Sequence, residues 1–182
     1  MNQNSKFSVR DICYAGLFAA VIAVMAQISI PMPLGVPMTM QTFAITLAAV
    51  VLGSKLSAIA TLVYLMLGAV GVPVLANFQG GPSAIFGKTG GYAIGYILTA
   101  LITALLVRVL GRKFWALCVA MVVGCAACYL LGTIWFMTLT GADLVSALGW
   151  CVLPYLPGDA VKIVLAAMLT IQLDKRLKGS LV

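Results

Sequence analysis

The chain has 182 residues, the length of about one domain, and 63% of them are apolar while 8% are charged. An ordinary soluble domain has roughly 45–50% apolar and about 25% charged residues, and the mean hydropathy here is +1.15. These values exclude a water-soluble globule and indicate an integral membrane protein. The chain has no His or Glu, and its four acids are Asp11, Asp143, Asp159 and Asp174. Most acid–base and metal-dependent enzyme chemistries therefore lack their residues.

Six apolar segments are candidates to cross a hydrocarbon core of roughly 30 Å, which takes about 20 helical residues. In chain order they are 12–30, 36–52, 56–72, 91–110, 114–139 and 151–173. The first exceeds the usual apolar region of a cleaved signal peptide, so we expect it to be retained. The pattern predicts an all-α membrane protein, a bundle of six transmembrane helices in one integral membrane domain over residues 1–182.

The formal charge of +7 is spread between the apolar segments instead of being gathered in a patch with aromatic residues, which argues against a nucleic-acid partner. Six spans place both termini on one side of the membrane. Nine of the eleven basic residues fall on that side: Lys6, Arg10, Lys55, Arg108, Arg112, Lys113, Lys175, Arg176 and Lys178. By the positive-inside rule, we expect both termini to be cytoplasmic.

The connections on the two sides differ in length. The cytoplasmic turns at 53–55 and 111–113 are short, whereas the outer connections at 31–37, 73–90 and 140–157 are longer, and the first two are rich in Gly and Pro. Irregular backbone near a membrane is tolerated where it is buried in protein or lines a cavity. We therefore expect the outer face to carry the binding site.

Asp159 and Lys162 are the most informative pair. Pro157 suits a helix start, and an acid in the first turn suits the positive end of the helix dipole. A spacing of three places both side chains on one helical face. Ionisable residues inside a span are costly and usually face an interior or a watery cavity. The pair therefore indicates a ligand site, and the alternative is a capping acid with a structural ion pair.

The segment 73–82 is the second candidate. Asn77 and Gln79 each offer an amide donor and a carbonyl acceptor, which suit a neutral ligand such as a urea or an amide. Gly80 and Gly81 would let backbone approach that ligand closely. A solvent-exposed turn is the alternative interpretation of this segment.

Two apparent motifs are incomplete. Gly87-Lys88-Thr89 resembles the end of a phosphate-binding loop, but position 82 is Pro where that pattern needs Gly. Cys125 and Cys128 have the spacing of a redox or metal motif, but no His or second Cys pair completes a site. We expect neither ATP binding nor a metal site, and we expect the cysteines to be small buried side chains.

Small residues mark two helix faces. Ala15, Ala19 and Ala23 form a stripe on the first segment, which would allow close approach of a partner helix or of a helix within this chain. Gly91 and Gly95 favour internal close packing. Aromatic side chains also gather near the predicted outer ends, as in a membrane-interface belt; these are Tyr92, Tyr96, Trp150 and Tyr155.

Taken together, four motifs resemble the BioY family, the biotin-specific S components (substrate-binding membrane subunits) of energy-coupling factor (ECF) transporters. They are Gly35-Val36-Pro37-Met38-Thr39-Met40-Gln41-Thr42-Phe43, Gly71-Val72-Pro73-Val74 with Phe78-Gln79-Gly80-Gly81, Thr89-Gly90-Gly91-Tyr92, and Pro154-Tyr155-Leu156-Pro157-Gly158-Asp159 with Lys162. The likeness covers nearly the whole chain. It departs at Lys88, where the family usually has Pro.

The resemblance implies high-affinity biotin capture at the outer face of a prokaryotic cell membrane, by a transport subunit that is not an enzyme and needs no cofactor. Its partners would be a transmembrane coupling subunit and two ATPase subunits. The implied docking residues are Ala15 and Ala19. The implied biotin-binding residues are Asn77, Asp159 and Lys162, and the motifs add Thr39, Gln41, Phe78, Gln79 and Tyr92. Lys162 would pair either with the ligand carboxylate or with Asp159.

Three alternatives remain open at this point. The chain could be an S component for another vitamin, or a self-sufficient facilitator of a small solute. It could also be a small intramembrane enzyme, for which the absence of His and Glu leaves only Asp and Lys as bases.

Overall fold

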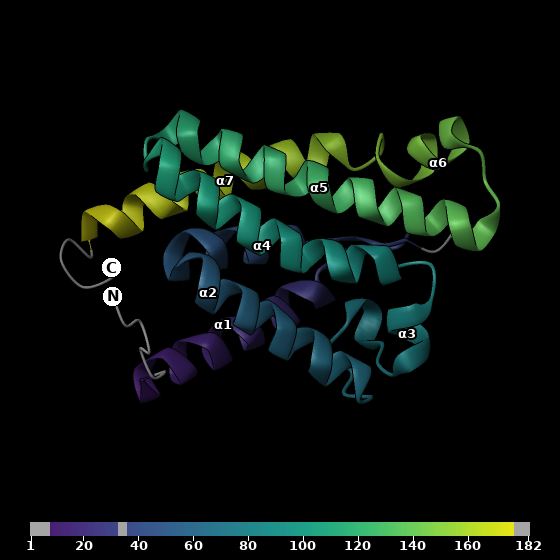
Figure 1. The fold of residues 1–182 in the computed structure, drawn as a ribbon, viewed down its shortest axis with the longest axis horizontal. Coiled ribbons are helices and arrows are strands. Elements are labelled where there is room, and N and C mark those ends of the chain that lie inside the picture. The colour runs from purple at the N-terminus through teal and green to yellow at the C-terminus, as the bar shows by residue number, and fades with distance from the viewer. Residues whose placement is uncertain (1–7, 33–35, 177–182) are drawn as a thin grey trace, which may run out of the picture.

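The computed structural model describes residues 8–32 and 36–176, which are mostly helical (Figure 1). Five helices there are long and apolar enough to cross a membrane, judged by length and composition. They are α1 (Val9–Gln27), α2 (Gln41–Ala69), α4 (Gly90–Leu110), α5 (Phe114–Thr140) and α7 (Leu156–Arg176). The segments predicted separately at 36–52 and 56–72 both fall in α2, so this count differs from the predicted six.

A break at Gly53 divides α2 into two arms. The backbone there has φ 76° and ψ 177°, which is not helical. The Gln41 side chain donates a hydrogen bond to the Tyr64 hydroxyl, yet in a continuous helix these residues would lie roughly 34 Å apart at 1.5 Å per residue. The chain therefore reverses direction at Gly53, where the sequence predicts a short turn. Whether each arm crosses the membrane stays a prediction, because the first arm is shorter than a full span.

The first outer connection contains a small hairpin. Before it, helix α1 begins at a capping box in which the Ser8 hydroxyl accepts a hydrogen bond from Arg10 N and the Asp11 carboxylate accepts one from Ser8 N.

In the hairpin itself, strand β1 (Ser29–Ile30) pairs antiparallel with β2 (Met38–Thr39). Residues 33–35, which include the first residue of the Gly35 motif, lie outside the described residues. The hairpin carries Thr39 to the start of α2.

The other outer connections contain short helices that the sequence did not indicate. A 3₁₀ turn, η2 (Ala76–Phe78), and α3 (Pro82–Phe86) lie between α2 and α4. Helix α6 (Leu144–Cys151) lies between α5 and α7, and Asp143 caps it by accepting from Ser146 N at 3.1 Å. Hydrogen bonding from the Ser146 side chain, and then from its backbone N–H, lowers the pKa of the Asp143 carboxyl. The connections are thus largely ordered by local hydrogen bonding.

Glycines bring α4 and α5 into close contact. A Cβ placed on Gly91 would lie 2.3 Å from Trp135 Cβ, and one on Gly95 would lie 2.7 Å from Cys128 Sγ. A Cβ on Gly132 would lie 2.4 Å from the Tyr92 ring. The prediction that Gly91 and Gly95 serve internal packing is confirmed.

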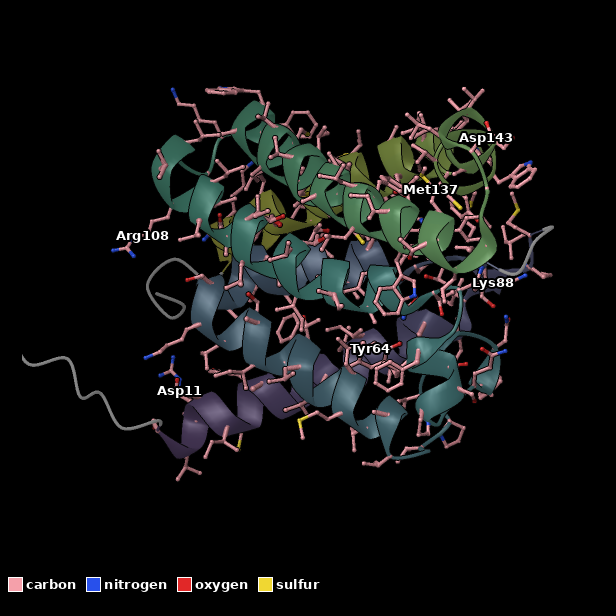
Figure 2. The ribbon with its side chains drawn as sticks, turned by 45° about the vertical axis from the view of Figure 1, so that its right-hand side comes forward. Asp11, Tyr64, Lys88, Arg108, Met137 and Asp143 are labelled. Atoms are coloured by element: carbon pink, nitrogen blue, oxygen red, sulfur yellow. The ribbon has the colours of Figure 1, made fainter. Side chains whose placement is uncertain are left out.

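The two ends of the bundle carry different charged groups. Figure 2 shows Asp11 and Arg108 near one end and Lys88 and Asp143 near the other. The start of α1 and the end of α7 share the first of these ends (Figure 1). This arrangement agrees with termini on one side, and which side faces the cytoplasm stays a prediction.

A polar cluster of Arg112, Asp174 and the Val50 carbonyl, called the clasp below, joins the helices at the end of the bundle that carries the chain termini. Arg112, between α4 and α5, pairs with Asp174 near the end of α7 through two contacts of 2.7 Å. It also donates to the Val50 carbonyl in the first arm of α2 at 3.1 Å. The clasp therefore joins three segments at the end of the bundle where α7 stops.

Candidate functional site

Asp159 and Lys162 lie side by side near the beginning of α7. Lys162 Nζ is 2.8 Å from Asp159 Oδ1, and Lys162 and Asp159 are 8% and 5% exposed, respectively. The helical spacing of three brings them together, as predicted. An ion pair this deeply buried is retained only with further hydrogen bonds, because removing both charges from water is costly.

Other elements supply these hydrogen bonds. The Tyr129 hydroxyl on α5 donates to Asp159 Oδ2, and the Thr42 hydroxyl on α2 lies 3.5 Å from Asp159 Oδ1. Lys162 also donates to the Thr39 carbonyl in β2 at 2.7 Å. The carboxylate and the ammonium on α7 are thus held by groups from three other elements.

A second polar cluster surrounds Gln41 at the start of α2. Its carbonyl oxygen accepts from the hydroxyls of Thr39 at 2.8 Å and Tyr96 at 3.2 Å. Its amide nitrogen donates to Tyr64, a fully buried residue that Figure 2 shows among the helices. The amide can donate one more hydrogen bond. Among the described residues, Gln41 is therefore fixed in place with one N–H group without a protein acceptor.

Residues of the two clusters line one cavity. It lies between the hairpin, the 74–79 segment and the parts of α2, α4, α5 and α7 that lie away from the chain termini. The volume of this cavity is about 90 Å³, several times the roughly 10–15 Å³ that one water needs. Apolar and aromatic side chains form much of the remaining wall, including Val36, Leu65, Leu75, Ile85, Tyr96, Tyr129 and Tyr155. The cavity can take an organic molecule with a polar head and an apolar body.

Most of the predicted binding residues meet in this cavity. Its lining includes six of the eight: Thr39, Gln41, Gln79, Tyr92, Asp159 and Lys162. Chain segments separated by more than a hundred residues are therefore brought to one site. Their contact with a ligand stays a prediction.

Asn77 and Phe78 do not line the cavity. Both have left-handed backbone, with φ 57° and φ 55°, and Phe78 is 71% exposed. The side-chain amide oxygen of Asn77 (Oδ1) accepts a hydrogen bond from the Ser29 hydroxyl on the hairpin. Their side chains are thus outside the cavity lining in this structure, and their contact with a ligand stays a prediction.

The alanine stripe of α1 faces inward. Ala15 and Ala19 are 4% and 3% exposed within this chain alone. Ala19 belongs to a core cluster with Ile22 and Tyr64. This placement corresponds to internal packing, the alternative that the sequence left open, and it offers little of either side chain to a partner.

The three tyrosines of the two polar clusters were not identified as site residues from the sequence. Tyr64 and Tyr129 sit in long apolar runs, where a tyrosine looks like any core residue, and Tyr96 was assigned to the interface belt. The only available signal was the cost of burying a tyrosine hydroxyl, which generally requires a polar partner. That rule indicates a partner without saying which one.

The cysteines behave mainly as small buried side chains. Cys125 and Cys128 are 5% and 3% exposed and line the cavity. Within residues 8–32 and 36–176 no three His, Cys, Asp or Glu side chains are grouped as metal ligands. Lys88 is exposed.

Comparisons with known proteins agree on one family. The family model of BioY matches residues 1–179. The chain is 38% identical to "Biotin transporter BioY" of Thermotoga maritima, over 92% of this chain and 97% of that protein. It is 36% identical to "Probable biotin transporter BioY" of Pyrococcus horikoshii, over 94% and 98%.

A solved structure has the same fold. The "S-component for biotin from an ECF-type ABC transporter" superposes with a TM-score of 0.84 at 25% identity, covering 96% of this chain and 95% of that one. The family match spans nearly every residue, and the relatives align along almost their full length. The chain belongs to the BioY family.

Proposed function

We propose that this chain is the biotin-binding S component of an ECF transporter, a transport subunit and not an enzyme. The observation that carries the proposal is the buried Asp159–Lys162 pair, which lines a cavity in a chain of the BioY family. The relatives that match most of its length are named as biotin transporters.

The chemistry of the cavity suits biotin. A carboxylate such as Asp159 can accept the ureido N–H groups, and charge-assisted hydrogen bonds of this kind are the strong ones. The remaining N–H of Gln41 can donate to the ureido oxygen. The apolar wall suits the sulfur-containing ring and its aliphatic chain. We propose Thr39, Gln41, Gln79, Tyr92, Asp159 and Lys162 as the contact residues.

Lys162 serves first to hold Asp159. Two of the three N–H groups of its ammonium are taken by Asp159 and the Thr39 carbonyl, which, within the part of the chain that the structure describes, leaves one for a ligand oxygen. This geometry favours Lys162 as the partner of Asp159 over a role devoted to the ligand carboxylate.

The membrane arrangement and the partners form part of the same proposal. Counting the two arms of α2 separately, the chain would cross a prokaryotic cell membrane six times, with both termini cytoplasmic and the cavity at the outer face. Uptake would require a transmembrane coupling subunit and two ATPase subunits, and no cofactor. The reversal at Gly53 and the basic residues near the terminal end support this arrangement.

The test is binding by the purified chain in lipid nanodiscs. Calorimetry should show saturable binding of biotin and no binding of thiamine or riboflavin at the same concentrations. Selective binding of another vitamin would contradict biotin as the ligand. Liposomes that contain the chain alone should not take up biotin, whereas addition of the coupling and ATPase subunits with ATP should start uptake. Uptake by the chain alone would indicate a facilitator.

A further inference from the structure

Gln27, the last residue of α1, is hydrogen-bonded to a loop about fifty residues away in sequence. Its amide nitrogen lies 3.1 Å from the carbonyl oxygens of Val74, Leu75 and, in its own helix, Ala23, so its two N–H groups are shared among three acceptors. Its side-chain amide oxygen (Oε1) accepts a hydrogen bond from Phe78 N at 2.9 Å. One side chain thus holds both ends of the 74–78 turn.

This turn has an unusual backbone. Asn77 and Phe78 are consecutive residues in the left-handed region, and they are the only non-glycine residues with positive φ in the described part of the chain. Asn tolerates that region, but a bulky residue such as Phe is an outlier there. Phe78 gains little packing in exchange, since it is 71% exposed. Interactions elsewhere must therefore stabilise the turn.

The same turn forms one wall of the cavity. Leu75, Ala76 and Gln79 line it, whereas Gln27 does not. Leu75 N donates to the Gln79 carbonyl at 3.0 Å across the base of the turn. A change in the backbone at Phe78 would therefore move the cavity wall on both sides of it.

We propose that Gln27 is a positioning residue for biotin binding. It acts from outside the cavity, and its hydrogen bonds to Val74, Leu75 and Phe78 hold Asn77 and Phe78 in the left-handed conformation that places Leu75, Ala76 and Gln79 in the wall. This inference rests on the proposed function only in taking biotin as the ligand.

The first test replaces the amide with an apolar side chain of similar size. Gln27→Leu should weaken biotin binding about tenfold, or 1.4 kcal/mol, because several backbone groups lose their partner at once. Gln172→Leu is the matched control, since Gln172 lies on an exposed face of α7 and should keep wild-type affinity. Gln27→Asn, which keeps the amide but shortens the side chain, should weaken binding in the same direction.

The second test asks whether Gln27 acts through the left-handed turn. Glycine adopts positive φ without strain, so in a Phe78→Gly background the loss caused by Gln27→Leu should shrink to about threefold or less. A purely structural contact of Gln27 would give the same loss in both backgrounds. Equal losses, or no loss on Gln27→Leu, would overturn the proposal.

A third measurement uses the wild-type protein without ligand, so it does not depend on whether a variant folds. In the wild-type protein without biotin, hydrogen exchange at the Phe78 amide should be strongly slowed, because this N–H is bonded to Gln27. Exchange at Phe78 as fast as in an unprotected peptide would overturn the proposal. If the wild type shows slow exchange at Phe78 but binds no biotin, the proposed function fails while the positioning of the turn stands.

Discussion

Lys162 on α7 and Thr39 in β2 are joined by a 2.7 Å hydrogen bond from the buried ammonium to the backbone carbonyl. The same ammonium pairs with Asp159. One side chain therefore connects the last helix to the hairpin that precedes α2, and both contacts lie at the cavity.

Replacing Lys162 should destabilise the protein more than replacing the pair. Lys162→Met leaves the Asp159 carboxylate buried without its cation, and breaking a buried pair in this way costs about 3–5 kcal/mol. Asp159→Asn combined with Lys162→Met removes both charges. We expect thermal unfolding in nanodiscs to rank the wild type highest, the double variant second and Lys162→Met lowest. A single variant that melts at or above the double variant would contradict this account of the pair.

A methyl group at Gly132 should disturb the cavity through Tyr92. A Cβ added at this position would lie 2.4 Å from the Tyr92 ring, whose hydroxyl is bonded to the Cys151 carbonyl. We expect Gly132→Ala to lower the melting temperature and weaken biotin binding, since overpacking typically costs about 1–3 kcal/mol. Gly16→Ala on α1 is the control, because, apart from its own neighbours in the helix, no atom of residues 8–32 and 36–176 lies within 4 Å of a Cβ placed there. Equal behaviour of the two variants would argue against close packing of α4 on α5.

The reversal in α2 should require glycine at position 53. Its φ of 76° with ψ of 177° belongs to a region that is essentially restricted to Gly, and another residue there costs about 1–3 kcal/mol. Gly53→Ala should therefore unfold at a lower temperature than Gly16→Ala, although, apart from neighbours along the chain, no described residue lies within 4 Å of a Cβ at either position. An unchanged melting temperature for Gly53→Ala would contradict the reversal.

The cavity cysteines should report occupancy. Cys125 and Cys128 line the cavity, whereas Cys13 is exposed on α1. Saturating biotin should slow modification of Cys125 and Cys128 by a small methanethiosulfonate reagent and leave Cys13 unchanged, as read by mass spectrometry of the intact and digested protein. Slowing of all three cysteines alike would indicate a global effect in place of a shielded cavity.

The charged part of the site is predictable from the sequence, because the chain has only four acidic residues and no His. Asp159 and Lys162 stand out as ionisable residues in an apolar segment, where their cost demands an interior location. The turn at Gly53 was also predictable, since a Gly-Ser-Lys stretch interrupts two apolar runs.

Other parts of the site depend on tertiary structure. The side chain of Tyr129 reaches Asp159 across thirty positions, and no local pattern distinguishes it from a core tyrosine. Asn77 was expected at the ligand from its amide and from the family resemblance; here it has left-handed backbone, accepts from the Ser29 hydroxyl and is not part of the cavity lining, none of which a local pattern indicates. Helix α6 was missed because a stretch of only eight residues between two long helices gives no clear periodicity.

The central claim is that the Asp159 carboxylate binds the captured ligand. The most direct measurement is the calorimetric affinity for biotin of Asp159→Asn in nanodiscs, with Asp174→Asn as the control on the same helix at its opposite end. We expect Asp159→Asn to bind biotin about 5- to 150-fold more weakly, as for a buried hydrogen-bonding group left unmatched, and Asp174→Asn to bind like the wild type. Wild-type affinity in Asp159→Asn would contradict the account.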